Sequence, residues 1–344
     1  MDKSLLSKTA AAMVARGKGI LAADESSGTC ETRFKSVGVD CTEESRRAYR
    51  GLLLTTPGVE QYLSGVILFD ETARQKTNEG TPFPDYLAKK GILPGIKVDG
   101  GAKNLPLHPG EKVTDGLDGL PKRLEEYFKM GCRFAKWRAV ITLGNGIPSH
   151  ACIYANAHAL ARYAGACLEA SIVPIIEPEV LLDGDHTVER CEEVTEATLR
   201  ACYAALAAYD VAPEYVILKA SMVVSGKNNP RQAGVDEVAE RTVRILKRTV
   251  PAAVPGIVFL SGGQSDEVAT AHLNAMNKMF AGKLPWPLSF SYGRALQHAS
   301  LHAWKGSAAN VPAAQAALLH RARMNSLAHS GRYTADLEKQ AQPA

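Results

Sequence analysis

Eight short apolar runs, each leading to a polar residue, are spread along the chain. They occupy residues 19–23, 66–69, 93–96, 133–135, 172–176, 215–218, 257–260 and 288–290, and the polar residues that follow are Asp24, Asp70, Lys97, Lys136, Glu177, Lys219, Ser261 and Ser291. Short runs rich in β-branched and aromatic residues are typical of buried parallel strands. The pattern therefore predicts eight strands, each with a polar group at its end.

The intervals between these runs carry helical patterns. Residues 151–170 are rich in Ala and Leu, and residues 186–210 form a long amphipathic stretch. Ser265, followed by two acidic residues, has the sequence of an N-cap and predicts a helix through Phe280. Strand and helix alternating eight times predict a (β/α)8 barrel, or TIM barrel, with residues 5–16 and 311–328 as additional terminal helices.

A doubly wound open sheet has the same alternation. In an open sheet only the strands near the switch point need polar groups at their ends, whereas in a barrel all carboxyl ends converge on one site. Since every run here leads to a polar residue, the closed barrel is favoured. We expect one domain over residues 1–331 and a mobile, polar tail over residues 332–344.

Composition narrows the partners of this barrel. The chain has 344 residues and a net charge of +4, and its basic residues form no runs, so neither nucleic acid nor a membrane surface is the expected partner. Scattered Lys and Arg residues are compatible with a small anionic substrate.

The cysteines and the apolar segments bear on the cellular compartment. Seven cysteines without C-x-x-C spacing favour reduced thiols over a disulfide framework or a structural zinc site. With no apolar stretch near the ~18–20 residues of a membrane span and no signal-peptide segment in residues 1–18, we expect a cytoplasmic location without membrane insertion.

Lys219 is the first candidate for chemistry, because it closes an apolar run and lysine is rarely buried unless paired. Burial and nearby cations both disfavour an ammonium group and lower its pKa. A neutral amine attacks a carbonyl and forms an iminium, which accepts the electrons of an adjacent carbon–carbon bond. The alternative is a lysine whose stem packs on the core while its amine reaches solvent.

Charged residues of both signs accompany this lysine. Lys136 and Arg138 lie two positions apart on one predicted strand, as do Glu177 and Glu179 on the next, so each pair points to one side. Lys136 supplies a cation near Lys219, and a carboxyl group beside the amine serves as acid and then base. The alternatives are a structural ion pair for Lys136 and carboxylates that only balance the two lysines.

Asp24 follows the first run and could orient substrate hydroxyl groups or take the proton of the C4 hydroxyl. Its alternative is to cap the following loop or helix, which is the common role of an aspartate after a strand.

Two glycine-containing loops suggest a phosphate site. Ser261, Gly262 and Gly263 follow the seventh run, and Ser291, Gly293 and Arg294 follow the eighth. Glycines let backbone N–H groups approach an anion, barrels often bind phosphate after strands 7 and 8, and arginine adds a charged fork. Gly-Gly alone is usually a turn; the two loops together with the arginine favour phosphate.

No motif for a nucleotide or a metal accompanies these residues. The chain has no G-x-G-x-x-G, Walker A or H-E-x-x-H sequence, and its nine histidines show no ligand spacing. We expect neither a metal nor another cofactor.

Taken together, these residues resemble the class I fructose-1,6-bisphosphate aldolases over about residues 5 to 333. The matching stretches are residues 19–26 (GILAADES), 66–72 (VILFDET), 95–99 (GIKVD), 134–138 (FAKWR), 176–179 (IEPE), 183–186 (DGDH), 259–265 (FLSGGQS) and 290–297 (FSYGRALQ). The resemblance implies a homotetrameric barrel of glycolysis and gluconeogenesis that needs no metal. Its reaction is the reversible cleavage of fructose 1,6-bisphosphate to dihydroxyacetone phosphate and glyceraldehyde 3-phosphate.

The resemblance also implies roles for individual residues. Lys219 matches the Schiff-base lysine and Glu177 the principal acid/base. Asp24, Lys136 and Glu179 match residues that support proton transfer and stabilise intermediates, and Arg138 matches one that positions the substrate. Ser261, Gly262, Gly263, Ser291, Gly293 and Arg294 match the site for the phosphate on C1, and Ser26, Arg33 and Lys97 match positions toward the other phosphate.

The chain departs from the family pattern at three places. Ala220 and Ser221 follow Lys219 where the family commonly has Pro-Asn, and Thr29 and Thr32 stand where many members have Ser and Lys. Animal members end in a tyrosine that assists proton exchange on the enamine, whereas the last tyrosine here is Tyr333. We expect these departures to bear on local rigidity, on the second phosphate and on enamine protonation.

Two alternatives to the leading hypothesis remain. One is the same chemistry on sedoheptulose 1,7-bisphosphate or fructose 1-phosphate. The other is a secondary role as a binding scaffold. Scaffolding alone is disfavoured because every expected catalytic side chain is present.

Overall fold

The computed structural model of the chain describes residues 1–339 and contains a closed barrel of eight parallel strands. The strands are β1 (Gly19–Ala23), β2 (Leu63–Leu68), β3 (Leu93–Lys97), β6 (Phe134–Ile141), β7 (Val173–Val180), β8 (Ile217–Ala220), β9 (Ile257–Phe259) and β10 (Leu288–Tyr292). Around the barrel they follow the order β1-β10-β9-β8-β7-β6-β3-β2. Parallel pairing of Ile20 with Ser291 joins β1 to β10, so the predicted (β/α)8 barrel is confirmed and an open sheet is excluded.

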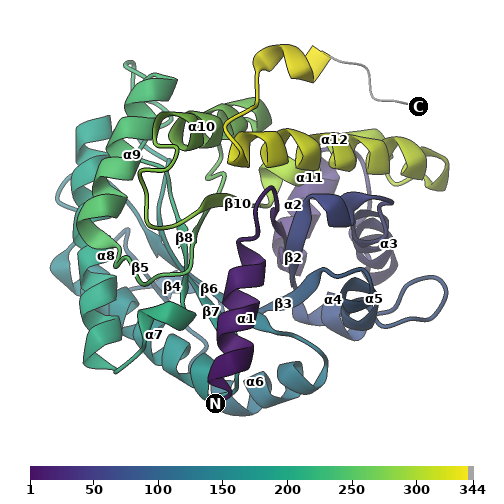
Figure 1. Cartoon of the computed structure of the whole chain (residues 1–344), viewed down its shortest axis with the longest axis horizontal. Helices are drawn as coiled ribbons and strands as arrows, with labels where there is room; N and C mark the ends of the chain where they lie inside the picture. The colour runs from purple at the N-terminus through teal and green to yellow at the C-terminus, as the bar shows by residue number, and fades with distance from the viewer. Residues whose placement is uncertain (340–344) are drawn as a thin grey trace.

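Helices form a ring around this barrel (Figure 1). They are α1 (Lys3–Met13), α2 (Ser27–Lys35), α3 (Glu43–Leu54), α4 (Asp70–Arg74), α5 (Phe83–Lys89), α6 (Leu120–Lys129), α7 (His150–Glu169), α8 (Val188–Ala208), α9 (Val235–Thr249), α10 (Asp266–Met279), α11 (Arg294–Trp304) and α12 (Val311–His329). The predicted helices after residues 151, 186 and 265 and at both ends of the chain are confirmed. The N-cap at Ser265 is confirmed too, because its side chain accepts a hydrogen bond from the backbone of Val268.

Several strands are longer than the apolar runs that predicted them, and β6 and β7 exceed their runs the most. β6 and β7 each have eight residues and pair along their full length, from Phe134 opposite Val173 to Ile141 opposite Val180. The prediction that the polar residues follow the strand ends is therefore wrong for Lys97, Lys219 and Ser291, which belong to β3, β8 and β10. It is also wrong for Lys136 and Glu177, which lie inside β6 and β7. A charge inside a buried strand is tolerated when it has a partner of opposite sign, and both residues have one.

Aromatic side chains fill the barrel interior where strand glycines leave room. A Cβ atom at Gly95 would lie 2.2 Å from the ring of Phe134, and one at Gly19 would lie 2.6 Å from the ring of Phe290. Large and small residues on facing strands thus interdigitate in a packed core rather than a pore.

The segment around α1 closes the amino end of the barrel. Ser64, in β2, donates a hydrogen bond from its hydroxyl to the carbonyl of Met13 at 2.6 Å. Just before β9, a side chain at Gly256 would collide with Val14 at 2.6 Å. With this end covered by α1, the cavity that the polar strand ends line opens at the carboxyl end of the barrel.

The described part of the predicted tail is attached to the barrel. Residues Ala335–Lys339 form a 3-10 helix, η4, which lies above α12 in Figure 1. Glu338 pairs with Arg321 at 2.6 Å and accepts a hydrogen bond from the hydroxyl of Tyr333 at 3.0 Å. The rest of the predicted tail, residues 340–344, lies outside the described residues.

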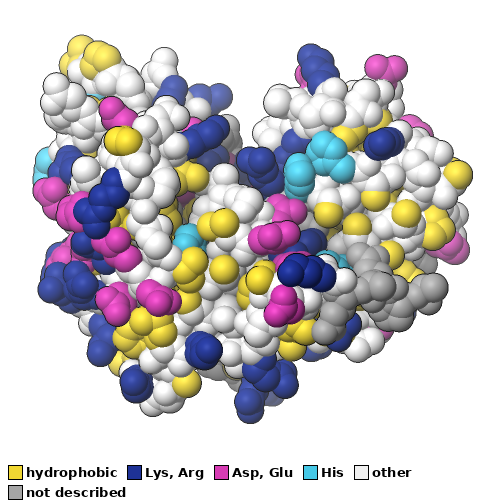
Figure 2. All heavy atoms as spheres, turned by 90° about the horizontal axis from the view of Figure 1, so that it is seen from above, with side chains coloured by type: hydrophobic (Ala, Val, Ile, Leu, Met, Phe, Trp, Pro, Cys, Tyr) yellow, Lys and Arg dark blue, Asp and Glu magenta, His cyan; other side chains and the backbone are white. Residues whose placement is uncertain are grey.

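The surface carries charges of both signs. On the face drawn in Figure 2, Lys and Arg side chains are scattered among acidic ones rather than gathered in one large patch. Within residues 1–339, no helix is both long enough and apolar enough to cross a membrane. The seven cysteines have free thiols, and all except Cys41 are buried.

Candidate active site

A cavity of about 850 Å³ opens at the carboxyl ends of the strands. All fifteen candidate residues line it: Asp24, Ser26, Arg33, Lys97, Lys136, Arg138, Glu177, Glu179, Lys219, Ser261, Gly262, Gly263, Ser291, Gly293 and Arg294. These residues come from strands and loops that are far apart in the sequence. Barrel closure brings them together, because the carboxyl ends of all eight strands meet around one opening.

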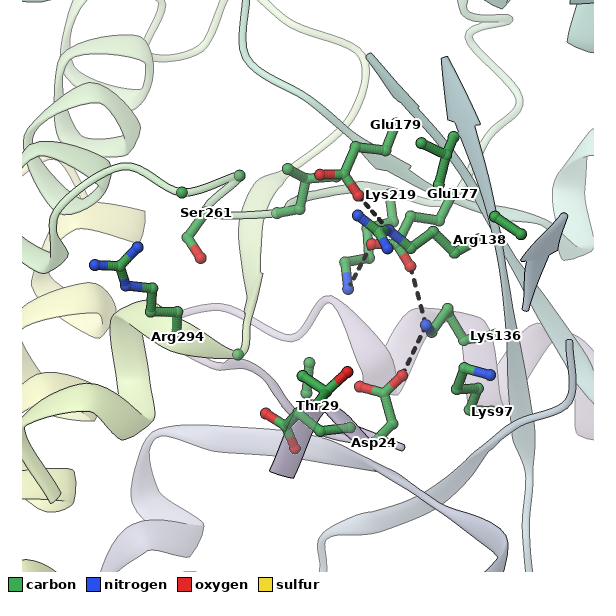
Figure 3. Close-up of a pocket in the computed structure, with 18 of the residues that line it drawn as sticks. Asp24, Thr29, Lys97, Lys136, Arg138, Glu177, Glu179, Lys219, Ser261 and Arg294 are labelled. Carbon is green, nitrogen blue, oxygen red and sulfur yellow. Dashed lines mark hydrogen bonds and ion pairs between the residues drawn. The ribbon is translucent and has the colours of Figure 1, made fainter. Parts of the chain in front are cut away.

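Lys219 lies at one end of a chain of ion pairs. Its Nζ is 3.0 Å from one carboxylate oxygen of Glu177, and the other oxygen of Glu177 is 3.3 Å from Nζ of Lys136. Lys136 in turn lies 2.7 Å from Asp24 (Figure 3). The Lys219 side chain is only 5% exposed, so its amine does not face bulk water as the alternative interpretation requires.

These pairs fix the charges of Lys136 and Asp24. Burial disfavours both charged groups, but the carboxylates of Asp24 and Glu177 outweigh it and raise the pKa of Lys136 well above its usual range. For Asp24, burial is likewise outweighed by the ammonium groups of Lys136 and Lys219, which hold the pKa of the carboxyl well below its usual range. Lys136 is therefore a fixed cation and Asp24 a fixed anion at neutral pH.

A second group of charges lies beside the first. The guanidinium of Arg138 pairs with Glu179, and Lys97 pairs with Asp99 at 2.7 Å. Burial opposes the charge on Arg138, but the carboxylate of Glu179 keeps the pKa of Arg138 above its ordinary value. The alternation on β6 and β7 thus places Arg138 and Glu179 in the same cavity as Lys136 and Glu177, as predicted.

Asp99 was not among the predicted site residues. Its side chain is 3% exposed, pairs with Lys97 and accepts a hydrogen bond from the backbone of Arg138 at 3.2 Å. It therefore holds two cavity residues in place. The signal in the sequence was its position two residues after Lys97, beyond the end of the third run.

Glu25 is the second residue that sequence reasoning missed. It pairs with Arg33, which lines the cavity, and with the buried Arg50 at 2.8 Å. The side-chain amide of Gln297 also donates to it. In the sequence Glu25 is only the neighbour of Asp24, and nothing local shows that it meets residues of α3 and α11.

The glycines of the two candidate phosphate loops have specific structural roles. Gly262 and Gly263 have φ values of 54° and 84°, in the left-handed region that glycine adopts at little cost. A side chain at Gly293 would press on the carbonyl of Ala22 at 3.2 Å. Arg294 is the first residue of α11, where unpaired backbone N–H groups favour an anion.

Ser291 is a further polar group suited to a ligand. Its hydroxyl is buried, lines the cavity and has no hydrogen-bond partner within residues 1–339. Since buried polar groups are normally paired, such a hydroxyl is available to a bound molecule. Figure 3 shows Ser261 and Arg294 on one side of the cavity and Lys97 and Lys136 on the other.

A neutral histidine supports the loop after β9. Nδ1 of His272 lies 2.6 Å from the side-chain oxygen of Gln264, whose amide donates to the carbonyl of Ser261 at 3.0 Å. Burial lowers the pKa of His272 to about 4, so the ring is uncharged at neutral pH. The loop that holds Ser261 is thereby tied to α10.

The departures from the family pattern have visible local consequences. The hydroxyl of Ser221 accepts a hydrogen bond from the backbone of Val180 at 3.0 Å and lies 3.2 Å from the Val180 carbonyl, joining β7 to the residues after β8. Thr29 lines the cavity, whereas the exposed Thr32 donates to the carbonyl of Gly28 at 3.1 Å. No cation therefore stands at position 32.

Comparison with known proteins identifies the family. The model of the family described as fructose-bisphosphate aldolase class-I matches residues 5–344. A probable fructose-bisphosphate aldolase class 1 of Xanthomonas campestris pv. campestris is 61% identical over 334 residues, covering 97% of this chain and 99% of that protein. The cytosolic fructose-bisphosphate aldolase 4 of Arabidopsis thaliana is 53% identical, covering 94% and 82%.

A solved structure agrees in both fold and sequence. The fructose-bisphosphate aldolase from Plasmodium falciparum superposes with a TM-score of 0.94 at 46% identity and covers 96% of each chain. A match at this identity over nearly the whole length goes beyond a shared barrel, which alone carries no function. The chain therefore belongs to the class I fructose-bisphosphate aldolase family, and it is a lyase.

Proposed function

We propose that Lys219 is the amine through which this aldolase cleaves fructose 1,6-bisphosphate, and that Glu177 is its principal acid and base. The observation that carries the proposal is the burial of the Lys219 amine 3.0 Å from a Glu177 oxygen. At that distance a proton moves directly between the two groups. Transfer from the ammonium to Glu177 leaves the neutral amine that attacks the C2 ketone.

Glu177 then serves the formation of the Schiff base. Attack on C2 gives a carbinolamine, and Glu177 returns its proton to the carbinolamine hydroxyl, which leaves as water. The product is an iminium between Lys219 and C2. Lys136, held as a cation 3.3 Å from Glu177, favours the ionised carboxylate before and after this proton transfer.

The iminium makes cleavage of the C3–C4 bond possible. Electrons of that bond flow to the iminium nitrogen and give an enamine, while a carboxylate takes the proton of the C4 hydroxyl. Asp24 is suited to this step, because it is ionised and lies 2.7 Å from the cation of Lys136. Glyceraldehyde 3-phosphate leaves. Protonation of the enamine at C3 and hydrolysis of the iminium then free dihydroxyacetone phosphate and the Lys219 amine.

The two phosphates have separate sites in this proposal. Ser261, Gly262, Gly263, Ser291, Gly293 and Arg294 bind the phosphate on C1, and Ser26, Arg33 and Lys97 lie toward the other. Left-handed glycines, the start of α11 and the unpartnered hydroxyl of Ser291 support the first assignment. Arg138 positions the substrate between them, and Glu179 pairs with Arg138 and supports the intermediates.

This chemistry uses the protonated Schiff base as its electron acceptor, so we propose that it needs no metal ion or other cofactor. Chelation with EDTA is expected to leave the cleavage rate unchanged. Loss of activity that is restored by a divalent metal would contradict the proposal.

Trapping the intermediate tests the role of Lys219. Borohydride added with dihydroxyacetone phosphate is expected to label the chain irreversibly, and peptide mapping is expected to find the label on Lys219. Lys219→Met should remove both label and activity, whereas the exposed, cavity-remote Lys247→Met should retain both. A label on another lysine, or full activity of Lys219→Met, would overturn the assignment.

Other ketose phosphates are alternative substrates of the same site. Position 32 carries no cation, and Arg33 is paired with Glu25, so the charge that faces the second phosphate is reduced. Ratios of kcat/KM for fructose 1,6-bisphosphate, sedoheptulose 1,7-bisphosphate and fructose 1-phosphate decide among them. If kcat/KM for fructose 1-phosphate equalled or exceeded that for fructose 1,6-bisphosphate, the bisphosphate would not be the preferred substrate.

We also propose that the chain forms a homotetramer in the cytoplasm. Family membership supports the tetramer, and relatives named as cytosolic aldolases support the location. Sedimentation of the purified protein tests the first, and a monomer or dimer at micromolar concentration would contradict it. Fractionation of cells tests the cytoplasmic location.

A secondary role as a binding scaffold would appear as binding to a partner protein that persists in the inactive variant Lys219→Met.

A further inference from the structure

Lys227, in the loop after β8, places an exposed charged side chain at the entrance of the cavity. Lys227 lines the cavity but does not belong to the set of candidate residues. It is exposed, and it forms no ion pair with any carboxylate in the part of the chain that the structure describes. A cation at the entrance to a site for a doubly phosphorylated sugar is well placed to meet the substrate.

Backbone hydrogen bonds fix the position of Lys227. Its N–H donates to the carbonyl of Leu182 at 2.8 Å, and the flanking N–H groups of Gly226 and Asn228 donate to His186 and Gly184 at 2.8 and 2.9 Å. The backbone at Gly226 lies so close to that at Gly184 that a side chain at position 226 would not fit. A Cβ atom there would lie 2.6 Å from the carbonyl oxygen of Gly184. Three hydrogen bonds and this close contact therefore hold the backbone around Lys227, while the Lys227 side chain is exposed.

The same neighbour connects Lys227 to the loop after β9. Leu182, which accepts the hydrogen bond from Lys227, also packs beside Gly263, since a Cβ atom there would lie 3.6 Å from a Leu182 methyl group. Both Leu182 and Gly263 line the cavity. Lys227 thus stands on the side of the mouth that carries the proposed site for the phosphate on C1.

Strand order places Lys227 and Arg294 on either side of that site. β9 lies between β8 and β10 in the barrel. Lys227 follows β8, the loop of Ser261 to Gly263 follows β9, and Arg294 follows β10. The residues proposed for the other phosphate follow β1 or end β3, and β8 neighbours neither strand.

The charge at this phosphate site is incompletely balanced by Arg294 alone. A phosphate monoester carries about −1.5 to −2 at neutral pH. The carboxylates of Glu179 and Asp183 line the same cavity, and Glu179 is already paired with Arg138. A second cation would offset both the phosphate and the exposed Asp183.

We propose that Lys227 binds the phosphate on C1 of the substrate from the side opposite Arg294. This inference rests on the proposed function of the site. It adds a cation from the loop after β8 to a phosphate site built from the loops after β9 and β10. Because the lysine is exposed, its contribution is to substrate affinity and falls with ionic strength.

The test compares Lys227→Met, which removes the charge, with Lys227→Arg, which keeps it, and with Lys247→Met as a control on the exposed face of α9. Three quantities are measured: KM and kcat for fructose 1,6-bisphosphate, the same for fructose 1-phosphate, and the concentration of dihydroxyacetone phosphate that half-saturates borohydride trapping. Fructose 1-phosphate and dihydroxyacetone phosphate keep only the phosphate in question.

Lys227→Met is expected to raise both KM values and the half-saturating concentration by about threefold to tenfold, with kcat within about twofold. Lys227→Arg and Lys247→Met should match the unmodified chain. KM values that stay within about twofold would overturn the role, and a rise confined to the bisphosphate would assign Lys227 to the other phosphate and overturn it equally. If borohydride and dihydroxyacetone phosphate failed to label the unmodified chain, the proposed function would be overturned, and the proposed role of Lys227 would fall with it.

Discussion

The side-chain amide of Gln297, in α11, donates a hydrogen bond to Glu25, in the loop after β1, at 2.8 Å. The same amide donates to the carbonyl of Ala22 at 2.6 Å. Glu25 also pairs with Arg33, and Gln297 lies one helical turn after Arg294. One buried carboxylate therefore joins the loops that carry the two proposed phosphate sites.

Replacing Glu25 by Gln is expected to destabilise the fold, since it leaves the guanidinium of Arg50 buried without its counter-charge. Arg50 is 3% exposed in its side chain and Glu25 is 8% exposed. Breaking such a buried pair costs about 3–5 kcal/mol of unfolding free energy. Urea unfolding followed by circular dichroism measures the change.

The control for this substitution is Glu44→Gln, which removes an exposed carboxylate paired with Arg47. We expect the urea midpoint of that variant to match the unmodified chain. If Glu25→Gln were equally stable, Glu25 would not be the group that balances Arg50.

Replacing Glu177 by Gln is expected to lower kcat by about a hundredfold to ten-thousandfold, because a proton shuttle is removed from the Lys219 amine. The rate of borohydride trapping with dihydroxyacetone phosphate should fall with it, since the same group serves carbinolamine dehydration. Stopped-flow cleavage assays and timed trapping measure the two rates.

Glu111→Gln is the matched control for Glu177→Gln. Its side chain is 2% exposed, accepts a hydrogen bond from the backbone of Ser149 and does not line the cavity. We expect kcat of this variant to be unchanged. A kcat for Glu177→Gln within tenfold of the unmodified chain would assign the principal acid and base to another carboxyl group.

The barrel was predictable because its signals are local. Each apolar run and each helical stretch can be recognised within about a dozen residues of sequence. Their regular alternation then predicts the (β/α)8 topology. The pairs Lys136 with Arg138 and Glu177 with Glu179 were predictable for the same reason, since alternate residues of a strand face one side.

The remaining parts of the site depend on contacts between distant segments. Glu25 and Gln297 are separated by 272 positions, and nothing near either residue indicates the other. The extent of β6 and β7 was missed because a charged residue ends an apolar run but does not end a strand when a neighbouring strand supplies its counter-charge. Lys227 was missed because the hydrogen bonds that hold its loop at the cavity go to the loop after β7, about 40 positions earlier in the chain.

Acidification is expected to destabilise the chain partly through Asp24. The lysines around Asp24 lower its folded pKa, so the unfolded state binds a proton more readily than the folded state does. The stabilisation is complete above the ordinary aspartate pKa of 3.8 and is lost as the pH falls from that value toward the folded pKa.

Asp24→Asn removes this contribution, so its unfolding free energy should fall less steeply than that of the unmodified chain between about pH 4 and pH 2. Urea titrations at each pH measure the slopes, with Glu31→Gln as a control on the exposed face of α2. Equal slopes for Asp24→Asn and the unmodified chain would show that the pKa of Asp24 is the same in both states.

Glu338 is expected to hold the last described segment of the chain against α12. Its carboxylate pairs with Arg321 at 2.6 Å, with His320 at 2.9 Å and with the hydroxyl of Tyr333, and Arg321 lowers its pKa against the opposing effect of burial. Glu338→Gln removes the charge and weakens all three contacts, so η4 should detach more often while the barrel stays folded. Limited trypsin digestion with mass spectrometry measures this as faster cleavage after Arg332, which lies in the segment that η4 holds in place.

The control is Asp336→Asn, which changes an exposed side chain of the same turn and should be cleaved at the unmodified rate. Equal cleavage of the Glu338 variant would mean that Tyr333 and Leu337 hold the segment through apolar contacts alone, because both pack against the core without needing the carboxylate.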